Sequence, residues 1–529
     1  MYRHCCTRAA RSLLLALTIS GLLELGNILF YQQLRLTSSL HPVEVLHREH
    51  VQDFQNKVRR QSRSLNEAAL EYRRRYGRAP PPRFEKWYEL ARAADYALID
   101  EFDEVMRSFQ TLWRVPPALL RARQEHVWRQ NISGFSFFRI KAGVVNATRD
   151  GQQSLDDTLL GRLQPYSQHG ILPDMEFLVN HLDEPRVFAN AEKDDDSSEL
   201  EWYELGQTAV ASVLQNACPL QHGHRASDLF VELKLITNIT VAKDYCEDPE
   251  LFQLHGFLQR PDTLNITRRL LPVLSSCAPL HFQDILLPGP AGPAYDEIGD
   301  VHIDEAFELH WEDKLDKLYW VGTSTGLYAT TNDWRTGHRQ RMALLFDVKQ
   351  PSDKLFTFLS PPNWRPYRAP LSTLQRLFDL RISRIHQCEE PACSEMTAIF
   401  LHGDGNQPLE DIGMSLEHKY VLDIDGNTWS GRFHRLLRSR SCVFKMTIFR
   451  QAHDDRLEPW FHYVPVSMSA RELPEIMRFF TQDARGREIA SNIADAGHQA
   501  ARRYIRATDA DIATLRVLLE LARLLDDGI

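Results

Sequence analysis

The sequence has no excess of basic side chains, few cysteines and no internal repeat. Over 529 residues the formal net charge is −9, which disfavours a nucleic-acid-binding protein, because that class usually carries a strong basic excess. None of the eight cysteines forms a CxxC pair or shows the Cys/His spacing of a zinc site. With 43% hydrophobic and 25% charged residues, the composition is that of an ordinary globular protein. The net negative charge remains compatible with a local basic site that binds a small anion.

A long apolar run, SLLLALTISGLLELGNILF at residues 12–30, lies near the N-terminus. It approaches the roughly 20 residues that span a bilayer, although Glu24 is a costly residue inside such a span. Three arginines precede it, so the positive-inside rule places the N-terminus in the cytoplasm. We therefore predict a cytoplasmic tail at 1–11, a transmembrane signal-anchor at 12–31 and a lumenal body. A cleaved signal peptide is the alternative.

Sequons and cysteines agree with a lumenal body. Four N-x-S/T triplets are candidate N-glycosylation sites, at Asn131, Asn146, Asn238 and Asn265. Disulfides can join Cys388 to Cys393 and Cys218 to Cys246, although the sequence does not fix the pairing. Cys442 lies in an apolar run, and we interpret it as a buried free thiol.

The length and the pattern of the chain predict two domains after a polar lead-in. We expect a stem and helical lead-in at 32–117, an N-terminal acceptor-side domain at 118–316 and a C-terminal domain at 317–529. Strand-like runs alternate with helical ones in both halves, which predicts two parallel-sheet α/β domains. Further strands are expected at Phe135–Val145 and Ala398–Leu401, and the chain after Ala470 should be helical.

The most informative stretch is KYVLDIDGNTWSGRFHRLLRSRSCVFK, at residues 419–445. It predicts a buried strand, a turn at Asp425-Gly426-Asn427, a helix capped by Thr428 or Ser430, and a second buried strand. The helix carries Arg432, Arg435 and Arg438, of which the last two are better explained as a solvated face. A turn that leads into a helix N-terminus beside arginine is suited to bind a diphosphate.

A second small-residue loop, GTSTG at residues 322–326, follows an expected strand at Lys317–Val321. Its size allows a ligand to approach the backbone, and Arg339 and Arg341 open the next helix. The loop also fits G-x-S-x-G, so an α/β-hydrolase with Ser324 as nucleophile is an alternative. The acid would be Asp404, Asp423 or Asp425, and the base His453 or His462. Asp423-x-Asp425 also resembles a metal-binding D-x-D motif, which we interpret as a turn with a nucleotide contact.

Two carboxylates follow another expected strand, Met175–Leu182. Ligands of open α/β sheets bind at the carboxyl ends of strands, so Asp183 and Glu184 are candidates for chemistry. The alternative is that they only solvate the strand end. Together these features favour transfer from a nucleotide sugar without a required metal. Arg432 and Lys445 would stabilise the leaving diphosphate, and a carboxylate of the other domain would deprotonate the acceptor hydroxyl.

Six segments resemble glycosyltransferase family 90, the family of fungal capsule-associated proteins and animal protein O-glucosyltransferases. They are YGRAPPPRFEKWYELA, LPDMEFLVNHLDEPRV, KLYWVGTSTG, HRQRMALL, KYVLDIDGNTWSGRFHRLLRSRSCVFKMTIF and DDRLEPWFHYVPV. The resemblance covers nearly the whole expected lumenal part, and the fungal branch looks closest. It implies two Rossmann-like domains facing a cleft in the GT-B arrangement, a UDP-sugar donor and inversion at the anomeric carbon.

The resemblance also assigns roles to residues. It places the acceptor-side base at Asp183, with Glu184 as the second choice. It places the donor site at Gly322, Thr323, Ser324, Thr325, Gly326, Arg339, Arg341, Asp425, Gly426, Asn427, Ser430, Arg432 and Phe433, to which the charge argument above adds Lys445. Two departures leave the donor sugar and the acceptor open. Leu182 replaces an arginine of the animal enzymes, and GTSTG lacks the arginine of their donor loop.

We therefore expect an inverting glycosyltransferase that moves xylose or glucose from a UDP-sugar to a glycan or glycoprotein acceptor. An inactive, membrane-anchored glycan-binding protein on the same fold is the alternative from another class. We expect no required cofactor and no nucleic-acid partner, and we leave stimulation by a divalent metal open. The signal-anchor, and the lack of a KDEL-type ending in LLDDGI, favour a type II protein of the Golgi, or otherwise the ER, membrane.

Overall fold

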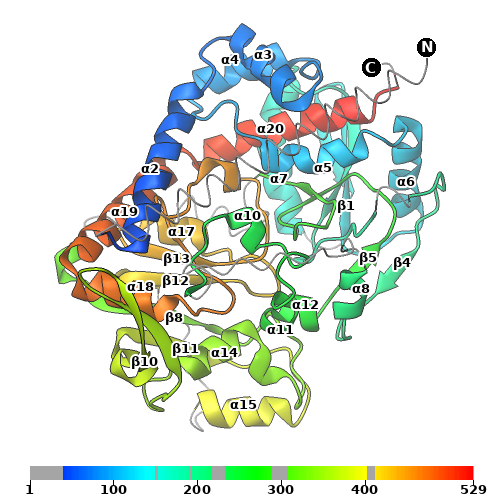
Figure 1. Ribbon diagram of the computed structural model, residues 1–529. Coiled ribbons are helices and arrows are strands. Elements are labelled where there is room, and N and C mark those ends of the chain that lie inside the picture. The colour runs from blue at the N-terminus through cyan, green and yellow to red at the C-terminus, as the bar shows by residue number, and fades with distance from the viewer. Residues whose placement is uncertain are drawn as a thin grey trace, which may run out of the picture.

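The computed structural model describes residues 40–148, 153–190, 194–216, 218, 233–288, 308–401 and 412–527. These residues form a mixed α/β protein in which two five-stranded sheets carry most of the core (Figure 1). The predicted α/β class is therefore confirmed. Among the helices that the structure describes, none is both long and apolar enough to cross a membrane. The predicted span at 12–31 lies outside the described residues.

The C-terminal sheet is parallel throughout and has the strand order β11-β8-β12-β13-β14. Every residue of its central strands β12 and β13 is buried, which explains why their sequences read as nearly continuous apolar runs. Its strands are β8 (Leu315–Thr323), β11 (Phe378–Arg384), β12 (His418–Ile424), β13 (Cys442–Met446) and β14 (Val464–Pro465). The helices joined to it include α14 (His338–Leu345), α17 (Phe433–Arg438), α18 (Leu473–Gln482) and α19 (Ala484–Arg503).

The N-terminal sheet has the order β2-β1-β3-β6-β7 and is mixed. β3 runs parallel to β6, and β6 parallel to β7, but β1 pairs antiparallel with both β2 and β3. The all-parallel arrangement predicted for this half is therefore wrong. The single strand expected at 135–145 is instead a hairpin, because Ala142 and Gly143 at its turn both adopt positive φ. Its strands are β1 (Phe135–Lys141), β2 (Val144–Thr148), β3 (Met175–Asn180), β6 (Val273–Ser275) and β7 (Ile285–Leu286).

Smaller elements complete the body. Two short antiparallel pairs are formed by β4 (Trp202–Glu204) with β5 (Asn265–Thr267) and by β9 (Leu355–Ser360) with β10 (Arg365–Pro370). Apart from the two N-terminal helices, the remaining described α-helices are α4 (Phe84–Ala93), α5 (Asp103–Leu112), α6 (Pro117–Arg129), α7 (Gln153–Gln168), α8 (Ala211–Gln215), α10 (Ile239–Ala242), α11 (Leu251–Leu254), α12 (Gly256–Gln259), α15 (Ala392–Phe400), α16 (Ile412–Leu416) and α20 (Ala507–Leu524). α15 occupies the strand expected at Ala398–Leu401, so that prediction is wrong.

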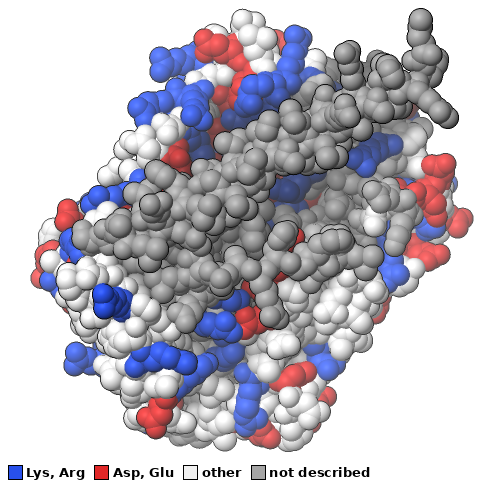
Figure 2. Space-filling view, in the orientation of Figure 1, with Lys and Arg blue, Asp and Glu red and all other residues white. Residues whose placement is uncertain are grey.

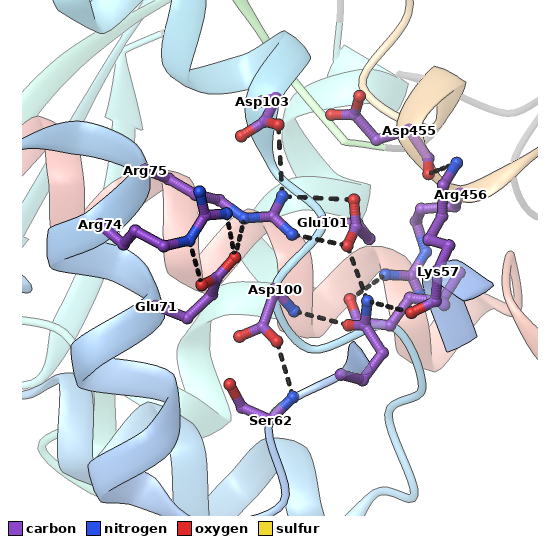
Figure 3. Close-up of polar contacts among 12 residues, drawn as sticks. Lys57, Ser62, Glu71, Arg74, Arg75, Asp100, Glu101, Asp103, Asp455 and Arg456 are labelled. Carbon is purple, nitrogen blue, oxygen red and sulfur yellow. Dashed lines mark hydrogen bonds and ion pairs between the residues drawn. The ribbon is translucent and has the colours of Figure 1, made fainter. Parts of the chain in front are cut away.

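The N-terminal helices α2 (Pro42–Arg60) and α3 (Leu65–Tyr76) pack against the body. In Figure 3, Arg75 lies between Glu71, Glu101 and Asp103, and the Ser62 N–H donates to Asp100 at 2.7 Å. On α2, Lys57 donates to the Asp455 carbonyl at 3.2 Å, far along the chain. From Pro42 onward, the predicted stem is therefore part of the folded body rather than a spacer.

The last helix, α20, returns to the N-terminal helices, beside which it lies in Figure 1. Trp87 of α4 donates its indole N–H to the Ile512 carbonyl at 2.9 Å, and Tyr72 of α3 donates to Glu520 at 2.9 Å. Helices at the two ends of the described chain thus share one core. The domain boundary at 316/317 stays a prediction.

Two disulfides join the predicted pairs, Cys218–Cys246 and Cys388–Cys393, with Cα–Cα distances of 5.3 and 5.4 Å. Cys277 and Cys442 are buried free thiols, as predicted for Cys442. On the face shown in Figure 2, acidic and basic side chains are interspersed, and basic ones gather at its upper edge over α3 and α4. The last turn of α3 contributes Arg73, Arg74 and Arg75 to this group.

Candidate functional site

The two predicted donor-site loops lie together at one edge of the C-terminal sheet. β8 and β12 are parallel neighbours, so the GTSTG loop and the turn after Ile424 emerge side by side. The Gly326 N–H donates to Oδ1 of Asn427 at 3.2 Å. A Cβ on Gly326, which has φ +104°, would lie 2.5 Å from the Gly426 carbonyl oxygen. Only glycine therefore allows this close approach of the loops.

Arg339 joins these two loops from α14. Its guanidinium donates to the Asp425 carbonyl at 2.7 Å, to the Thr325 hydroxyl at 2.8 Å and to the Thr323 carbonyl at 3.1 Å. Burial, reinforced by the nearby Arg432, lowers the pKa of Arg339 to about 9. With its fork engaged by protein acceptors, Arg339 shapes the loops instead of presenting a free cation.

Arg432, on the same loops, is more exposed than Arg339. It is half-buried and donates to the Val321 carbonyl at 2.7 Å, beside Gly322. A Cβ on Gly322 would meet an Arg432 nitrogen at 3.2 Å and the Trp320 ring at 2.6 Å, so the glycine makes room for both. The half-buried residues of this edge are Gly322, Thr323, Thr325, Asn427, Trp429 and Arg432.

The helix after the turn begins later than predicted. α17 starts at Phe433 with Arg432 at its N-cap, and no side chain caps it. Ser430 instead accepts the N–H of Arg432 at 3.4 Å, within the turn. The predicted cap by Thr428 or Ser430 is therefore wrong, because the turn takes up two more residues than its sequence indicates.

Several predicted donor-site residues face the core. Lys445 pairs with Asp423 at 3.3 Å and lies over the Phe433 ring. Asp425 is 1% exposed and pairs with His255 at 3.1 Å; burial raises its pKa to about 6. Both carboxylates of the D-x-D motif are thus bonded to protein side chains. Arg341 lies apart from the loops and donates to the carbonyls of Leu254 and Met468.

Ser324 does not have the surroundings of a hydrolase nucleophile. It is fully buried, its hydroxyl donates to the His386 carbonyl at 2.9 Å, and it accepts the His386 N–H at 2.8 Å. The proposed bases have other partners: His453 contacts His434, and His462 accepts the Glu458 N–H. Asp404 lies outside the described residues. The hydrolase alternative therefore does not fit.

The turn that carries Asp183 is fixed by polar groups on both sides. Asn180 donates its amide to the Glu184 carbonyl at 2.9 Å and accepts the Leu182 N–H at 3.1 Å. Buried Asp284 accepts the N–H of Arg186 at 2.8 Å just beyond the turn. Asp183 itself reaches solvent, and desolvation by the surrounding protein raises its pKa. An accessible carboxylate on a rigid turn can act as a proton acceptor.

Glu184 has the opposite surroundings. It is 2% exposed, and its Oε1 has no hydrogen-bond partner among the described residues. Burial raises its pKa to about 7, so the carboxyl is protonated over much of the range near neutral pH. The adjacent carboxyl groups thus differ in accessibility, which the sequence alone does not reveal.

Cys277 connects the Asp183 turn to the donor-site turn. Its thiol lies 4.0 Å from the Asp183 carbonyl oxygen. The thiol also forms hydrogen bonds to the Trp429 backbone and the Thr428 side chain. These bonds lower the pKa of Cys277, but burial has the larger effect and raises it. Next to it, the backbones of Ala278 and Arg450 pair at 2.9 and 3.2 Å. The ends of the two sheets are therefore in direct contact, with Asp183 on one side and residues 425–430 on the other.

A buried histidine pair supports the donor-site turn and was not predicted. His338 donates Nε2–H to the Asp425 carbonyl at 2.8 Å and stacks on His255, with ring centres 4.2 Å apart. Burial lowers the pKa of His255 to about 3 and that of His338 well below its usual value, so both rings are neutral. Single histidines in unrelated segments give no sequence signal for such a pair.

The sequons differ in accessibility. Asn131, Asn146 and Asn238 are exposed, as glycosylation requires. Asn265 is only half-buried, but the hydroxyl residue of its sequon, Thr267, is fully buried in β5. Modification of the three exposed sites stays a prediction.

Comparison with known proteins shows which family this chain resembles. Residues 403–527 match the family model described as Glycosyl transferase family 90. An O-glucosyltransferase rumi homolog of Aedes aegypti is 31% identical over 111 residues, which are 20% of this chain and 27% of the relative. Protein O-glucosyltransferase 2 of Danio rerio is 32% identical over 90 residues, 17% of either chain. The resemblance to glycosyltransferase family 90 is thereby confirmed, and the family match itself rests on residues 403–527.

A longer match joins the chain to a protein of unstated activity. Uncharacterized protein 035R of Invertebrate iridescent virus 3 is 24% identical over 244 residues, 42% of this chain and 19% of that protein. The chain thus spans less than a third of the length of each of these three relatives.

Proposed function

We propose that the protein is an inverting glycosyltransferase that moves a sugar from a UDP-sugar to a hydroxyl group of a glycan or glycoprotein. The observation that carries this proposal is the approach of the Asp183 turn to residues 425–430 around Cys277. One side offers an accessible carboxylate, and the other a loop pair with an arginine. Direct displacement at an anomeric carbon needs both a base and a stabiliser of the leaving group. The family match and the glucosyltransferase names of two relatives support the same class.

The proposed reaction is a single displacement. Asp183 accepts the proton of the acceptor hydroxyl. At the same time, the oxygen of that hydroxyl bonds to the anomeric carbon on the face opposite the diphosphate. The bond to the diphosphate oxygen breaks, UDP leaves with the electron pair, and the configuration inverts. Arg432 stabilises the charge that develops on the diphosphate.

Asp183 is a better base than Glu184 because it is accessible. Asp183 is exposed, whereas Glu184 is 2% exposed and cannot reach an acceptor without a rearrangement.

The finer assignments come from the sequence. The resemblance to the fungal branch favours xylose as the transferred sugar, with glucose as the alternative. The chain departs from the animal enzymes at Leu182 and in the GTSTG loop. No required cofactor is proposed, since Arg432 can neutralise part of the diphosphate charge. We place the protein in the Golgi or ER membrane through residues 12–31, with residues 32–529 in the lumen.

The test is a panel of UDP-sugars offered to the full-length chain, with release of UDP as the readout and free glycans as acceptors. We expect acceptor-dependent turnover with UDP-xylose or UDP-glucose. If every UDP-sugar is left intact while glycans still bind, the protein is an inactive glycan-binding protein and the proposal is wrong.

A further inference from the structure

A cavity of about 810 Å³ lies away from the site described above. It is bounded by α6, by β1 and the start of β3, by the residues before α4, and by the end of α20. Its volume falls within the range of about 300–1,000 Å³ that is typical of small-ligand sites. The cavity and Asp183 lie at opposite ends of β3, about 20 Å apart at the rise of a strand. A short acceptor whose hydroxyl lies at Asp183 therefore cannot occupy this cavity at the same time.

The cavity offers an aromatic surface in otherwise polar surroundings. Trp128 of α6 is 44% exposed and stacks on Phe137 of β1, with ring centres 5.3 Å apart. Pro82 and Pro173 also line the cavity. A tryptophan held flat by a buried phenylalanine presents a rigid, amphipathic ring, which gives contact area at little entropic cost. The apolar C–H face of a pyranose ring is a matching partner.

The charged groups of the cavity lining nearly balance, with four arginines and five carboxylates. Arg121 bonds to Asp527, and Arg139 bonds to Glu176 across β1 and β3. Such pairs present donors and acceptors without a net field, so the cavity suits a neutral, hydroxyl-rich ligand better than a polyanion. Arg523 is 6% exposed, and its buried Nε has no acceptor among the described residues.

The backbone around the cavity disfavours a peptide. At the residues that line the cavity, β1 is paired with both β2 and β3, so it offers no free ladder for an added strand. The other walls are helices and paired side chains. Recognition must therefore come from the aromatic surface and from side-chain donors and acceptors.

We propose that this cavity is a binding site for a neutral oligosaccharide, in contact with Trp128. Binding there does not depend on the transfer reaction. Its use as a second contact for a long acceptor glycan rests on the proposed function.

The test uses the full-length chain labelled with 5-fluorotryptophan and followed by ¹⁹F NMR. The chain has ten tryptophans, and the Trp128 and Trp429 resonances are assigned by their loss in Trp128→Phe and Trp429→Phe. Xylohexaose, cellohexaose and mannohexaose are titrated separately. We expect at least one of them to shift the Trp128 resonance in a saturable way. Trp128→Ala removes that resonance, so its affinity for the same sugar is measured by calorimetric titration and should be about tenfold weaker. Tyr367→Ala, which removes an equally exposed aromatic ring elsewhere, should leave the shift unchanged.

The proposal is wrong if none of the three sugars moves the Trp128 resonance, or if only Trp429, beside the catalytic turn, responds. It is also wrong if a neutral hexapeptide shifts Trp128 and the sugars do not. Failure of the proposed function gives a different result: the Trp128 shift persists while no UDP-sugar is turned over.

Discussion

At the scale of single residues, the proposed chemistry depends on Asp183. Its carboxylate is accessible, and the turn that carries it is fixed by Asn180 and Asp284. Asp183→Asn keeps the size and removes the proton acceptor. We expect transfer to fall by about 10²- to 10⁴-fold with unchanged thermal stability, measured as product formed per enzyme. Transfer at the wild-type rate would show that another group is the base.

A second prediction at the scale of single residues concerns the structural role of Arg339. Arg339→Lys loses the fork that bonds the Asp425 carbonyl and the Thr323–Thr325 segment, and it leaves buried acceptors without donors. We expect a loss of about 1–3 kcal/mol in the free energy of unfolding, measured by urea denaturation. Arg335→Lys is the matched control, since Arg335 is exposed and makes one ion pair at 3.3 Å. Equal stability of the two variants would contradict the bridging role.

At the scale of elements, the site depends on contact between the GTSTG loop and the turn after β12. Gly326→Ala places a Cβ 2.5 Å from the Gly426 carbonyl oxygen at φ +104°, so the loops must separate. We expect a loss of more than about 1 kcal/mol in stability, together with weaker UDP binding by calorimetry.

Gly431→Ala is the control for the same loop pair. Gly431 is exposed, and the nearest atoms to an added Cβ are 3.9 Å away, on the flexible Trp429 side chain. It should bind UDP like the wild type. Wild-type behaviour of Gly326→Ala would mean that the loop contact does not support the donor site.

The sequence predicted these elements unevenly. β8 and β12 were placed within two residues of their bounds and β13 within three, because buried parallel strands leave an apolar run bounded by turn residues. α15 was misread as a strand, since its last residues form a short apolar run that fits either structure. The β1–β2 hairpin was merged into one strand because its turn, Ala142-Gly143, is a weak hairpin signal.

Side-chain direction was the part of the site that the sequence could not predict. The GTSTG loop, Arg339 and the Asp425 turn do come together, as their places after parallel strands indicate. Whether Asp425 or Lys445 faces a ligand or the core depends on His255 and Asp423, and pairings between distant segments leave no local pattern. The different surroundings of Asp183 and Glu184 are likewise a tertiary effect.

At the scale of the whole molecule, buried titratable groups set the pH dependence of stability. Burial raises the pKa of Glu184 and of Glu472 to about 7, so the folded chain holds more protons than the unfolded chain above their ordinary value of 4.5. Stability from these carboxyls is therefore lost as pH rises through about 7. Buried His255, with its pKa lowered to about 3, acts in the opposite sense, and its cost disappears as pH rises to 6.5.

We therefore expect the wild type to lose stability relative to Glu472→Gln as pH rises from about 5 to about 8, measured by urea denaturation of both proteins at each pH. The comparison isolates the Glu472 carboxyl, because the histidine contributions are common to the two proteins. A difference in the free energy of unfolding that does not change over this pH range would contradict the assignment.

The central claim is that one half of the site holds the donor and the other activates the acceptor. Calorimetric titration of UDP into the wild type, Asp183→Asn and Arg432→Ala tests it most directly. We predict that Asp183→Asn binds UDP with wild-type affinity although its transfer rate is strongly reduced, and that Arg432→Ala binds UDP at least about tenfold more weakly. Loss of UDP binding in Asp183→Asn, or unchanged binding in Arg432→Ala, would contradict the division of the site.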